Sequence, residues 1–215
     1  MTSAVVLLSG GLDSAVAAGL FAAVPGQRLA ACLFGDYGQR AREREAAAAM
    51  RLAARWQVPF VRIGLPWLGE LAQRAGCRLL AGTGELPVGT SSVPGDAASA
   101  RAVWVPARNA VLVAIAAAHA ETLGASTVVA GFNREEAATF ADNSAAFVDA
   151  CTTMLRLGTQ NGVRVVSATL DLDKAAIVAA ARRLGFTAAD FWSCYEGGAE
   201  PCGRCESCLR SRWER

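Results

Sequence analysis

The stretch Ser9-Gly10-Gly11-Leu12-Asp13-Ser14 decides the fold of this chain. It follows the apolar run Ala4–Leu8 and precedes the Ala-rich segment Ala15–Val24, which is the order of a strand, a tight turn and a helix. Two adjacent glycines let a ligand approach the backbone closely, because no Cβ intervenes. The amides at the start of a helix favour an anion there. We therefore expect Leu8 through Ser14 to cradle an anion, most plausibly pyrophosphate.

The motif differs from two commoner glycine-rich loops. A Walker A loop requires a lysine near its end, and a dinucleotide-binding loop requires another glycine spacing. An ordinary strand-to-helix turn with Asp13 or Ser14 as the N-cap is the alternative. The complete pattern resembles the loop of the ATP pyrophosphatases, which cleave ATP between the α- and β-phosphates and leave AMP on the substrate.

Composition bounds the class of protein. The chain has 215 residues, of which 53% are hydrophobic and 19% charged, with a net charge of +2. It fits one core-forming domain with at most a small appendage, and nothing in the charge points to a nucleic acid or a membrane. No apolar run reaches about 18 residues, and no signal-peptide pattern opens the chain, so we expect a soluble, cytoplasmic protein. The odd number of cysteines, 7, argues against a disulfide framework.

Strand and helix signals alternate along the chain, which predicts parallel βαβ units. The fold class is therefore α/β, with a doubly wound, mostly parallel five-stranded sheet over residues 1–190 and a cysteine-bearing segment over 191–215. The expected strands are Ala4–Leu8, Leu29–Phe34, Pro59–Ile63, Thr127–Gly131 and Val163–Ser167. The expected helices are Ser14–Val24, Arg40–Trp56, a short one over 66–75, Ala110–Leu123, Ala145–Leu157 and one capped by Asp171–Lys174 that ends near Gly185.

Several positions beyond the strands are candidates for binding ATP. Ligands of such sheets bind at the carboxyl ends of the strands, which places Asp36 and Tyr37 beside the loop, where adenosine could lie. Ordinary turn chemistry is the alternative for both. Lys174, the only lysine among 21 basic residues, falls in the first turn of a helix and could reach the phosphates. The Gly- and Pro-rich residues 76–103 are read as a lid loop.

Two polar segments are candidates for the acceptor substrate or a metal. Arg108 and Asn109 follow Pro106 at the start of a helix, where a cation opposes the helix dipole unless an anion accompanies it. Arg108 is therefore a candidate carboxylate or phosphate clamp, a solvated arginine being the alternative. The polar residues of 132–144 could coordinate Mg²⁺ or read a base edge. Alternatively, they form a polar loop in which Asp142 or Asn143 caps the next helix.

Four cysteines close to the C-terminus have the spacing of a metal site. Cys194, Cys202, Cys205 and Cys208 form a C-x7-C-x2-C-x2-C pattern. Four thiolates complete the tetrahedral shell of Zn²⁺, which predicts a structural zinc site. An iron–sulfur cluster is the main rival. The neighbouring arginines either form a nucleic-acid knuckle with the cysteines or simply solvate the tail.

Together these motifs resemble the 7-cyano-7-deazaguanine synthases, enzymes of queuosine and archaeosine precursor synthesis, over nearly the whole chain. The resemblance rests on Ser9–Ser14, Tyr37–Arg40, Trp104–Asn109, Gly131–Asn133, Lys174 and Ser193–Gly198 through Cys208. It implies an adenine nucleotide alpha hydrolase-like fold. The chain departs from many bacterial members at Phe140–Ser144, where it looks more like the archaeal branch, with Ala141 in place of the usual proline. This departure falls where the resemblance places the deazapurine.

The resemblance implies an ATP-dependent ligase that releases AMP and pyrophosphate. It would convert 7-carboxy-7-deazaguanine and ammonia to 7-cyano-7-deazaguanine through adenylated acid and amide intermediates. Asp13, Ser14, Lys174 and Arg108 would then be catalytic, with Mg²⁺ and Lys174 on the pyrophosphate and Arg108 on the acceptor carboxylate. Asn109, Asn133 and either Asp142 or Glu135 would bind the deazapurine. The family is also commonly dimeric, which predicts a homodimer.

Other functions remain open from the sequence. A related ligase would join the deazaguanine acid to another amine, including one on a protein. A zinc-ribbon nucleic-acid-binding protein is the alternative outside enzymes, and the near-neutral charge weighs against it. A sulfur-inserting tRNA enzyme usually needs further catalytic cysteines, and neither Cys32 nor Cys151 is obviously placed for that.

Overall fold

The computed structural model describes residues 1–87, 97–210 and 213. Five strands form a single sheet in the order β3-β2-β1-β4-β5, and every pairing is parallel. The strands are β1 (Thr2–Leu7), β2 (Gln27–Asp36), β3 (Phe60–Gly64), β4 (Thr127–Val129) and β5 (Arg164–Val166). This confirms the predicted five-stranded parallel sheet.

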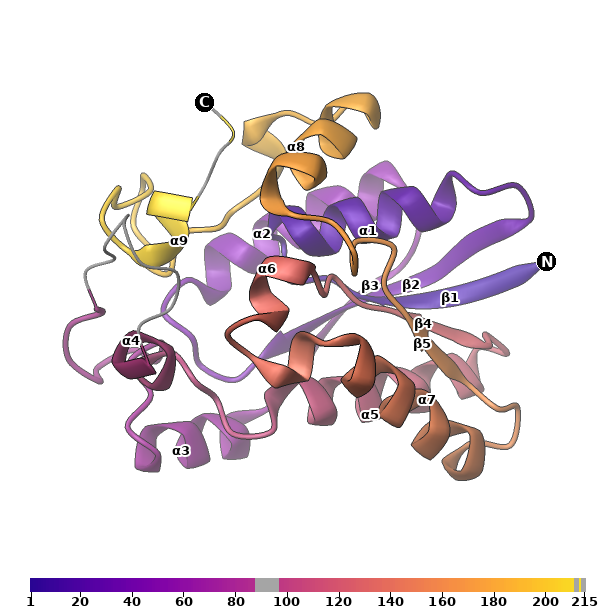
Figure 1. The fold of residues 1–215 in the computed structure, drawn as a ribbon, viewed down its shortest axis with the longest axis horizontal. Coiled ribbons are helices and arrows are strands. Elements are labelled where there is room, and N and C mark those ends of the chain that lie inside the picture. Colours follow the sequence, from indigo (N-terminus) through magenta and orange to yellow (C-terminus); the bar gives the residue numbers. More distant parts are fainter. Residues whose placement is uncertain (88–96, 211–212, 214–215) are drawn as a thin grey trace.

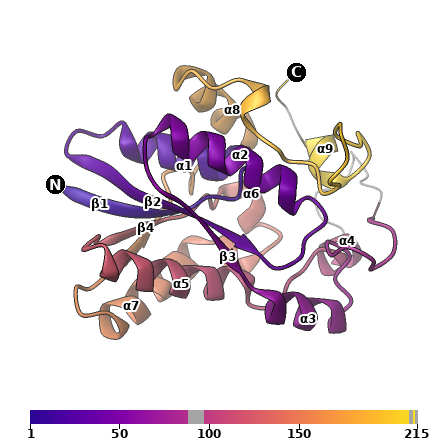
Figure 2. The same cartoon turned by 180° about the vertical axis from the view of Figure 1, so that it is seen from behind.

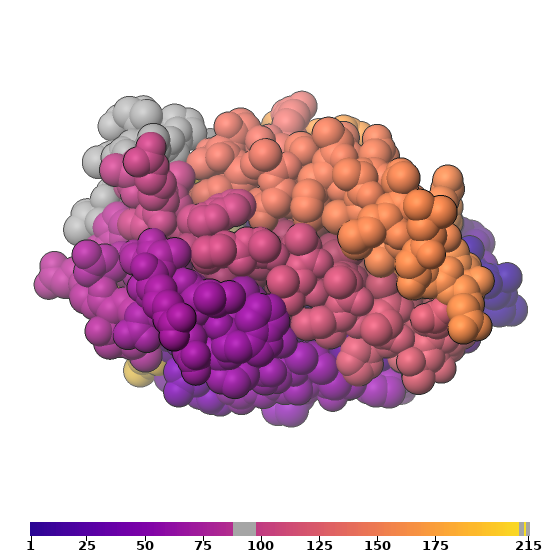
Figure 3. Space-filling view, turned by 90° about the horizontal axis from the view of Figure 1, so that it is seen from below, coloured from indigo at the N-terminus to yellow at the C-terminus, as the bar shows by residue number. Residues whose placement is uncertain are grey.

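Helices cover both faces of the sheet (Figures 1 and 2). One face carries α1 (Leu12–Ala22), α2 (Arg42–Arg55) and α8 (Lys174–Arg183), and the other carries α5 (Arg108–Thr122) and α7 (Ala145–Gly158). Figure 3 looks at the second face, where α5 in pink and α7 in orange lie next to each other. The sheet is therefore doubly wound, as predicted.

Alternation along β1 divides the core into two layers. Val6 packs with α1, α2 and α8, whereas Val5 packs with α5 and α7, and both side chains are fully buried. Successive strand residues face opposite sides of a sheet, so an apolar run with no polar residue is what a strand covered on both faces requires. This explains why Ala4–Leu8 carries no charge.

A third apolar cluster lies beyond the carboxyl ends of β2 and β3. It includes α3 (Pro66–Arg74), the neighbouring Leu79 and Leu80, and Val103, which follows α4 (Ala97–Ala102). The prediction of an irregular loop over 76–103 is wrong for 97–102, where an Ala-rich helix forms. Residues 88–96, the middle of the predicted lid, lie outside the described residues.

The segment between β4 and α7 contains two short helices rather than an irregular loop. These are α6 (Arg134–Ala137) and η1 (Ala141–Asn143). Ser144, and neither Asp142 nor Asn143, caps α7, because the Ser144 side chain accepts a hydrogen bond from the Phe147 amide. Asp173 caps α8 in the same manner, as expected from the sequence.

The C-terminal part adds η2 (Ala188–Asp190) and α9 (Glu206–Arg210). The strands β4 and β5 are shorter than predicted, because the chain leaves the sheet at Gly131 to pack against the start of α1. No helix in the described part of the chain is long and apolar enough to cross a membrane.

Strand order reverses at β1, which pairs with β2 on one side and β4 on the other. The crevice at such a reversal is where open α/β sheets bind their ligands. The Ser9–Ser14 loop follows β1 and the segment beginning at Ala130 follows β4, so the fold brings both to this crevice.

Candidate active site

The loop after β1 is organised by its two serines. The Ser14 hydroxyl accepts a hydrogen bond from the Ser9 amide at 3.2 Å and lies 3.0 Å from the Ser9 hydroxyl. The Ser9 hydroxyl in turn accepts from the Gly11 amide at 3.3 Å. These bonds hold the loop in a fixed turn at the start of α1, with hydroxyls and amides gathered at one place.

Two glycines allow the close approaches that this turn requires. Gly10 has a φ of +80°, and a Cβ there would lie 2.2 Å from the Glu45 carbonyl oxygen of α2. A Cβ on Gly131 would lie 2.5 Å from both the nitrogen and the Cα of Ser14. Only glycine fits at either position, so α2 and the chain after β4 clamp the loop from two sides.

Lys174 reaches the loop from the first turn of α8. Its Nζ lies 2.5 Å from Oδ2 of Asp13 and 3.8 Å from Oε1 of Glu136, and its backbone amide donates to the Glu135 carboxylate at 3.0 Å. Burial lowers the pKa of Lys174, but these carboxylates outweigh burial and the net shift is upward. The lysine is therefore a cation held at the Ser9–Ser14 turn.

The second oxygen of Asp13 has no partner within the described structure. Oδ1 is buried without a hydrogen bond, although Oδ2 is paired with Lys174. Leaving a buried carboxylate oxygen unsatisfied costs free energy. The vacant oxygen therefore fits a hard cation that would arrive with the phosphates.

Arg108 lies at the start of α5 and has no carboxylate within ion-pair distance among the described side chains. Its Nη1 donates to the Tyr37 hydroxyl at 3.4 Å and its Nε to the Asn109 side chain at 3.4 Å. Burial lowers the pKa of Arg108, but the neighbouring Tyr37 and Asp142 outweigh burial and the net shift is upward, so Arg108 stays charged. A partly buried guanidinium without an anion is an incomplete ion pair.

Asn109 and the aromatic residues shape the space around this guanidinium. The side-chain amide of Asn109 donates a hydrogen bond to the backbone carbonyl of Asp142 at 3.2 Å and so ties η1 to α5. The rings of Trp104 and Phe140 stack with centroids 6.0 Å apart and 14° between their planes. Burial raises the pKa of Asp142, and the nearby Arg108 opposes that shift.

One pocket of about 330 Å³ joins the loop, Lys174 and Arg108. Eleven of the residues predicted to bind ATP or the acceptor line this pocket: Leu8, Ser9, Gly11, Leu12, Asp13, Ser14, Tyr37, Arg108, Asn109, Asp142 and Lys174. The stacked Trp104 and Phe140 also line it. The Ser9–Ser14 turn and the unpaired guanidinium of Arg108 thus share one cavity.

Four residues predicted to bind ATP or the acceptor do not line the pocket, and each has another contact. Gly10 packs on α2, and Asp36 accepts from Arg62 at 2.6 Å and from the Gly38 amide at 3.0 Å. Asn133 is fully buried and accepts from the Glu136 amide as the cap of α6. Glu135 accepts from the Lys174 amide. Gly10, Asn133 and Glu135 therefore each contact a residue that lines the pocket, whereas the named partners of Asp36 do not line it.

Sequence reasoning assigned no role to several residues that line the pocket. Gln39 and Glu45 line it beside Tyr37, and the C-terminal segment adds Trp192, Ser193 and Tyr195. Gln39, Ser193 and Tyr195 belong to the segments on which the family resemblance rests, and that was the signal available for them. Glu45 had no such signal, because a glutamate in an Arg- and Glu-rich helix start resembles a solvated face.

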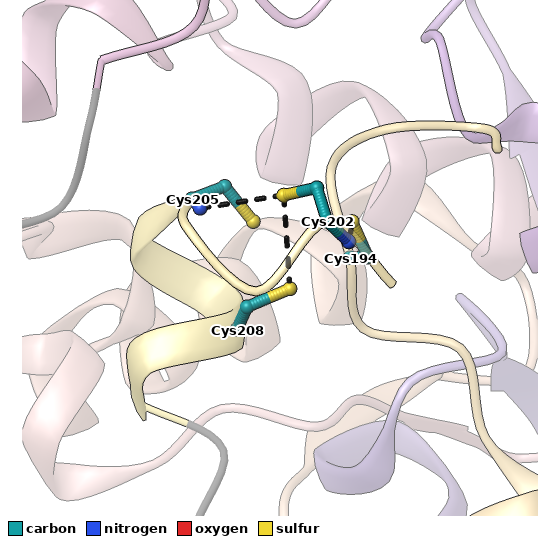
Figure 4. Close-up of side chains that lie close together, drawn as sticks. All are labelled: Cys194, Cys202, Cys205 and Cys208. Carbon is teal, nitrogen blue, oxygen red and sulfur yellow. Dashed lines mark hydrogen bonds between the residues drawn. The ribbon is translucent and has the colours of Figure 1, made fainter. Parts of the chain in front are cut away.

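The four cysteines converge on one point near α9 (Figure 4). Their sulfur atoms all lie within 4.8 Å of one another, and those of Cys202 and Cys208 are 3.9 Å apart. Thiolates about 2.3 Å from a tetrahedral ion lie about 3.8 Å apart, so the arrangement fits a metal. Among the described residues this is the one set of three or more Cys, His, Asp or Glu side chains that converges in this way. The carboxylates of 132–144, which the sequence offered for Mg²⁺, form no such set.

The cysteine segment packs against the α/β domain close to the pocket. The Trp192 amide donates to the Gly10 carbonyl at 2.9 Å, and Arg40 pairs with Glu196 at 3.5 Å. A Cβ on Gly197 would lie 2.4 Å from the Arg40 carbonyl oxygen. The metal-binding segment therefore forms part of the pocket wall.

Comparisons with known proteins agree over nearly the whole chain. The family model described as "Queuosine biosynthesis protein QueC" matches residues 3–213. The 7-cyano-7-deazaguanine synthase of Desulforudis audaxviator is 48% identical over 210 residues, covering 96% of this chain and 93% of its own. The synthase of Methanothermobacter thermautotrophicus is 39% identical over 213 residues, covering 97% and 92%.

Among solved structures, a 4-thiouridine synthetase in complex with RNA and bound ATP has a TM-score of 0.50 at 21% identity. The match covers 86% of this chain and 41% of that one, so the likeness extends to the fold of one part of a larger protein.

Proposed function

The chain belongs to the family of the queuosine biosynthesis protein QueC, and from this premise we propose that it converts 7-carboxy-7-deazaguanine and ammonia to 7-cyano-7-deazaguanine at the expense of ATP. The acid is first adenylated with loss of pyrophosphate, and ammonia then displaces AMP to give the amide. A second ATP activates the amide oxygen, and departure of AMP leaves the nitrile. AMP is a good leaving group, so no nucleophilic side chain is required.

The unpaired guanidinium of Arg108 is the observation that carries this proposal. It lines the same pocket as the phosphate-binding turn, it stays charged, and its partners there are neutral. A substrate carboxylate would complete the ion pair with charge-assisted hydrogen bonds. This would hold the acid where the α-phosphate of ATP can be attacked, and positioning of that kind supplies much of the rate in such transfers.

The opposite end of the pocket would bind the triphosphate. The Ser9–Ser14 turn offers amides and hydroxyls, and Lys174 offers a positive charge to the departing pyrophosphate. Asp13 would hold Mg²⁺ through its unpaired oxygen. The bound ion would neutralise charge on the phosphates, and Lys174 would offer its ammonium group to the phosphate oxygens.

The deazapurine would lie between the aromatic rings and Asp142. Trp104 and Phe140 offer flat apolar surface to a heterocycle, and the Asp142 carboxylate can accept guanine-like N–H donors. Asn109 holds the backbone of Asp142 in place. Asn133 and Glu135 would act indirectly, through α6 and Lys174.

Further assignments follow the same proposal. The cysteine set would hold Zn²⁺ as a structural ion, because four thiolates close its coordination shell. We also propose a cytoplasmic homodimer that acts on small molecules, with residues 1–190 as the ATP pyrophosphatase domain and residues 191–215 as the zinc segment.

Mass spectrometry of the products from ATP, Mg²⁺, ammonia and 7-carboxy-7-deazaguanine tests the function. The nitrile, with AMP rather than ADP, is the expected product. A halt at the amide or the acyl-adenylate would instead favour the related ligase that transfers the acid to another amine, including a protein amine. Phe140 lines the pocket, and it belongs to the segment Phe140–Ser144, in which this chain differs from many bacterial members of the family. A preference for a different acceptor would therefore arise at this segment.

A further inference from the structure

Four carboxylates line the pocket within the described structure, and two of them form ion pairs. Asp13 and Glu136 pair with Lys174, whereas Asp142 and Glu45 lie in the field of Arg108 without an ion pair. Glu45 has no cation within ion-pair distance among the described residues, and its side chain accepts a hydrogen bond from the neutral Gln39 amide at 3.0 Å. This half-buried carboxylate therefore has no directly paired counterion among the described residues.

The hydrogen bonds around Gln39 fix the position of the Glu45 carboxylate. The Gln39 side chain also donates to the Gly35 carbonyl and accepts from the Tyr37 amide, both at 3.0 Å. The Glu45 backbone carbonyl lies against Gly10 of the phosphate-binding turn. Glu45 thus stands in the pocket wall between that turn and Tyr37, and one oxygen has a described partner while the other is free to meet a ligand.

The proposed reaction requires a proton acceptor, and this inference rests on that reaction. When ammonia attacks the acyl-adenylate, a C–N bond forms, the C–O bond to AMP breaks, and the nitrogen loses one proton. When the adenylated amide becomes the nitrile, the nitrogen loses two protons as AMP departs with the C–O electron pair. His119, the only histidine of the chain, does not line the pocket.

We propose that Glu45 is the catalytic base that accepts these protons from the substrate nitrogen. It takes them one at a time and passes each to solvent before the next step. Electrostatic neighbours are compatible with this role: Arg108 favours the charged carboxylate, whereas Asp36 opposes it, and Tyr37 lies next to it as a neutral phenol. Burial raises the pKa of Glu45 to about 7, which suits a group that must both accept and release a proton near neutral pH.

The variant Glu45→Gln tests the assignment, because its amide oxygen keeps the hydrogen bond from Gln39. Exchange of labelled pyrophosphate into ATP, with the acid present and ammonia absent, measures adenylation alone. It should stay within about threefold of the wild type, whereas amide and nitrile formation should fall by roughly 10²- to 10⁴-fold. Glu43→Gln is the matched control, since Glu43 lies on the same helix but pairs with Arg62 and is exposed.

The pH profile separates a base from a positioning residue. At a fixed concentration of unprotonated ammonia, the wild-type kcat/KM for amide formation should fall as pH drops below about 7, and Glu45→Gln should lack this fall. Amide formation unchanged in Glu45→Gln, or an equal loss of exchange and amide formation, would overturn the assignment. If the wild type itself forms no amide, the proposed function fails first and the role of Glu45 with it.

Discussion

The backbone amide of Trp192 donates a hydrogen bond of 2.9 Å to the carbonyl oxygen of Gly10, which ties the cysteine segment to the Ser9–Ser14 turn. The same segment places Ser193 and Tyr195 in the pocket wall. Order in the cysteine segment and geometry at the turn are therefore expected to change together.

Replacing Cys205 with Ser should reduce the bound metal and weaken ATP binding. The variant removes one of four thiolates, so the segment loses the ion that orders it. Loss of the Trp192 hydrogen bond would cost about 1 kcal/mol, so ATP affinity should fall by roughly fivefold. Metal analysis and calorimetric titration measure both quantities. Cys151→Ser, at a buried cysteine outside the cluster, is the control, and an unchanged ATP affinity in metal-free protein would contradict the coupling.

Replacing Asp13 with Ala should abolish AMP release while the fold persists. The change removes the vacant oxygen offered to Mg²⁺ and the partner of Lys174, and a loss of at least about 10²-fold is expected for a group that acts on the departing charge. Acid-dependent AMP release measures the effect, and circular dichroism checks the fold. Asp149→Ala, at an exposed position on α7, should retain activity. Substantial AMP release by the Asp13 variant would argue against the whole phosphate site.

Replacing Arg108 with Lys should raise the KM for the acid much more than the KM for ATP. A lysine keeps the charge but cannot form the planar two-pronged contact with a carboxylate, so the change is not conservative there. We expect roughly a 30-fold or greater rise in KM for 7-carboxy-7-deazaguanine, the size of losing one charge-assisted hydrogen bond. Arg156→Lys on the exposed face of α7 serves as control. Equal changes in both KM values would point to a phosphate role for Arg108 instead.

Replacing Gly10 with Ala should destabilise the protein more than replacing Gly26 with Ala. Both glycines have nearly the same positive φ, +80° and +81°, but only a Cβ on Gly10 meets the Glu45 carbonyl at 2.2 Å. The left-handed backbone alone costs about 1–2 kcal/mol for alanine, and the clash should add about 1–3 kcal/mol. Urea denaturation of the two variants gives the difference. Equal losses would mean that α2 yields to the new methyl group.

The stability of the wild type should depend on pH through Glu45. The carboxyl has a pKa of about 7 in the folded protein against 4.5 for an unperturbed group, so the folded state binds the proton more tightly. This contribution is fully present below about pH 4.5 and is lost as pH rises through about 7. The denaturation midpoint of the wild type should fall as pH rises across this range. The midpoint of Glu45→Gln should lack this part of the pH dependence. Parallel midpoints would show that Glu45 is not buried as described.

The sequence predicts most of the fold because the sheet is covered on both faces. A run such as Ala4–Leu8 has no polar residue, and each such run ends at a glycine or a polar turn, so strand order in the chain is easily read. The short strands β4 and β5 were predicted too long, since burial continues in Ala130 and Val163 beyond the ladder. Helix α4 was missed because its alanines follow a Gly- and Pro-rich segment.

The candidate site is predictable only where a motif carries it. The loop and the cysteines have spacings that the chemistry requires, and Lys174 stands out as the only lysine, in the first turn of a predicted helix. All of them lie at or beside the pocket. Asp36 instead pairs with Arg62 across β2 and β3, a contact that depends on strand register and side-chain length. Glu45 faces the pocket because Gln39 and Gly10 set its surroundings, and no spacing in the sequence shows that.

Lys174 is the only lysine in the chain, and its ammonium group sits between Asp13 and Glu136. An amine-directed label therefore has one side chain to modify besides the N-terminus, and that side chain lies in the pocket. Protection of Lys174 from the label by added nucleotide would therefore measure occupancy of the pocket directly, without a substitution and without turnover.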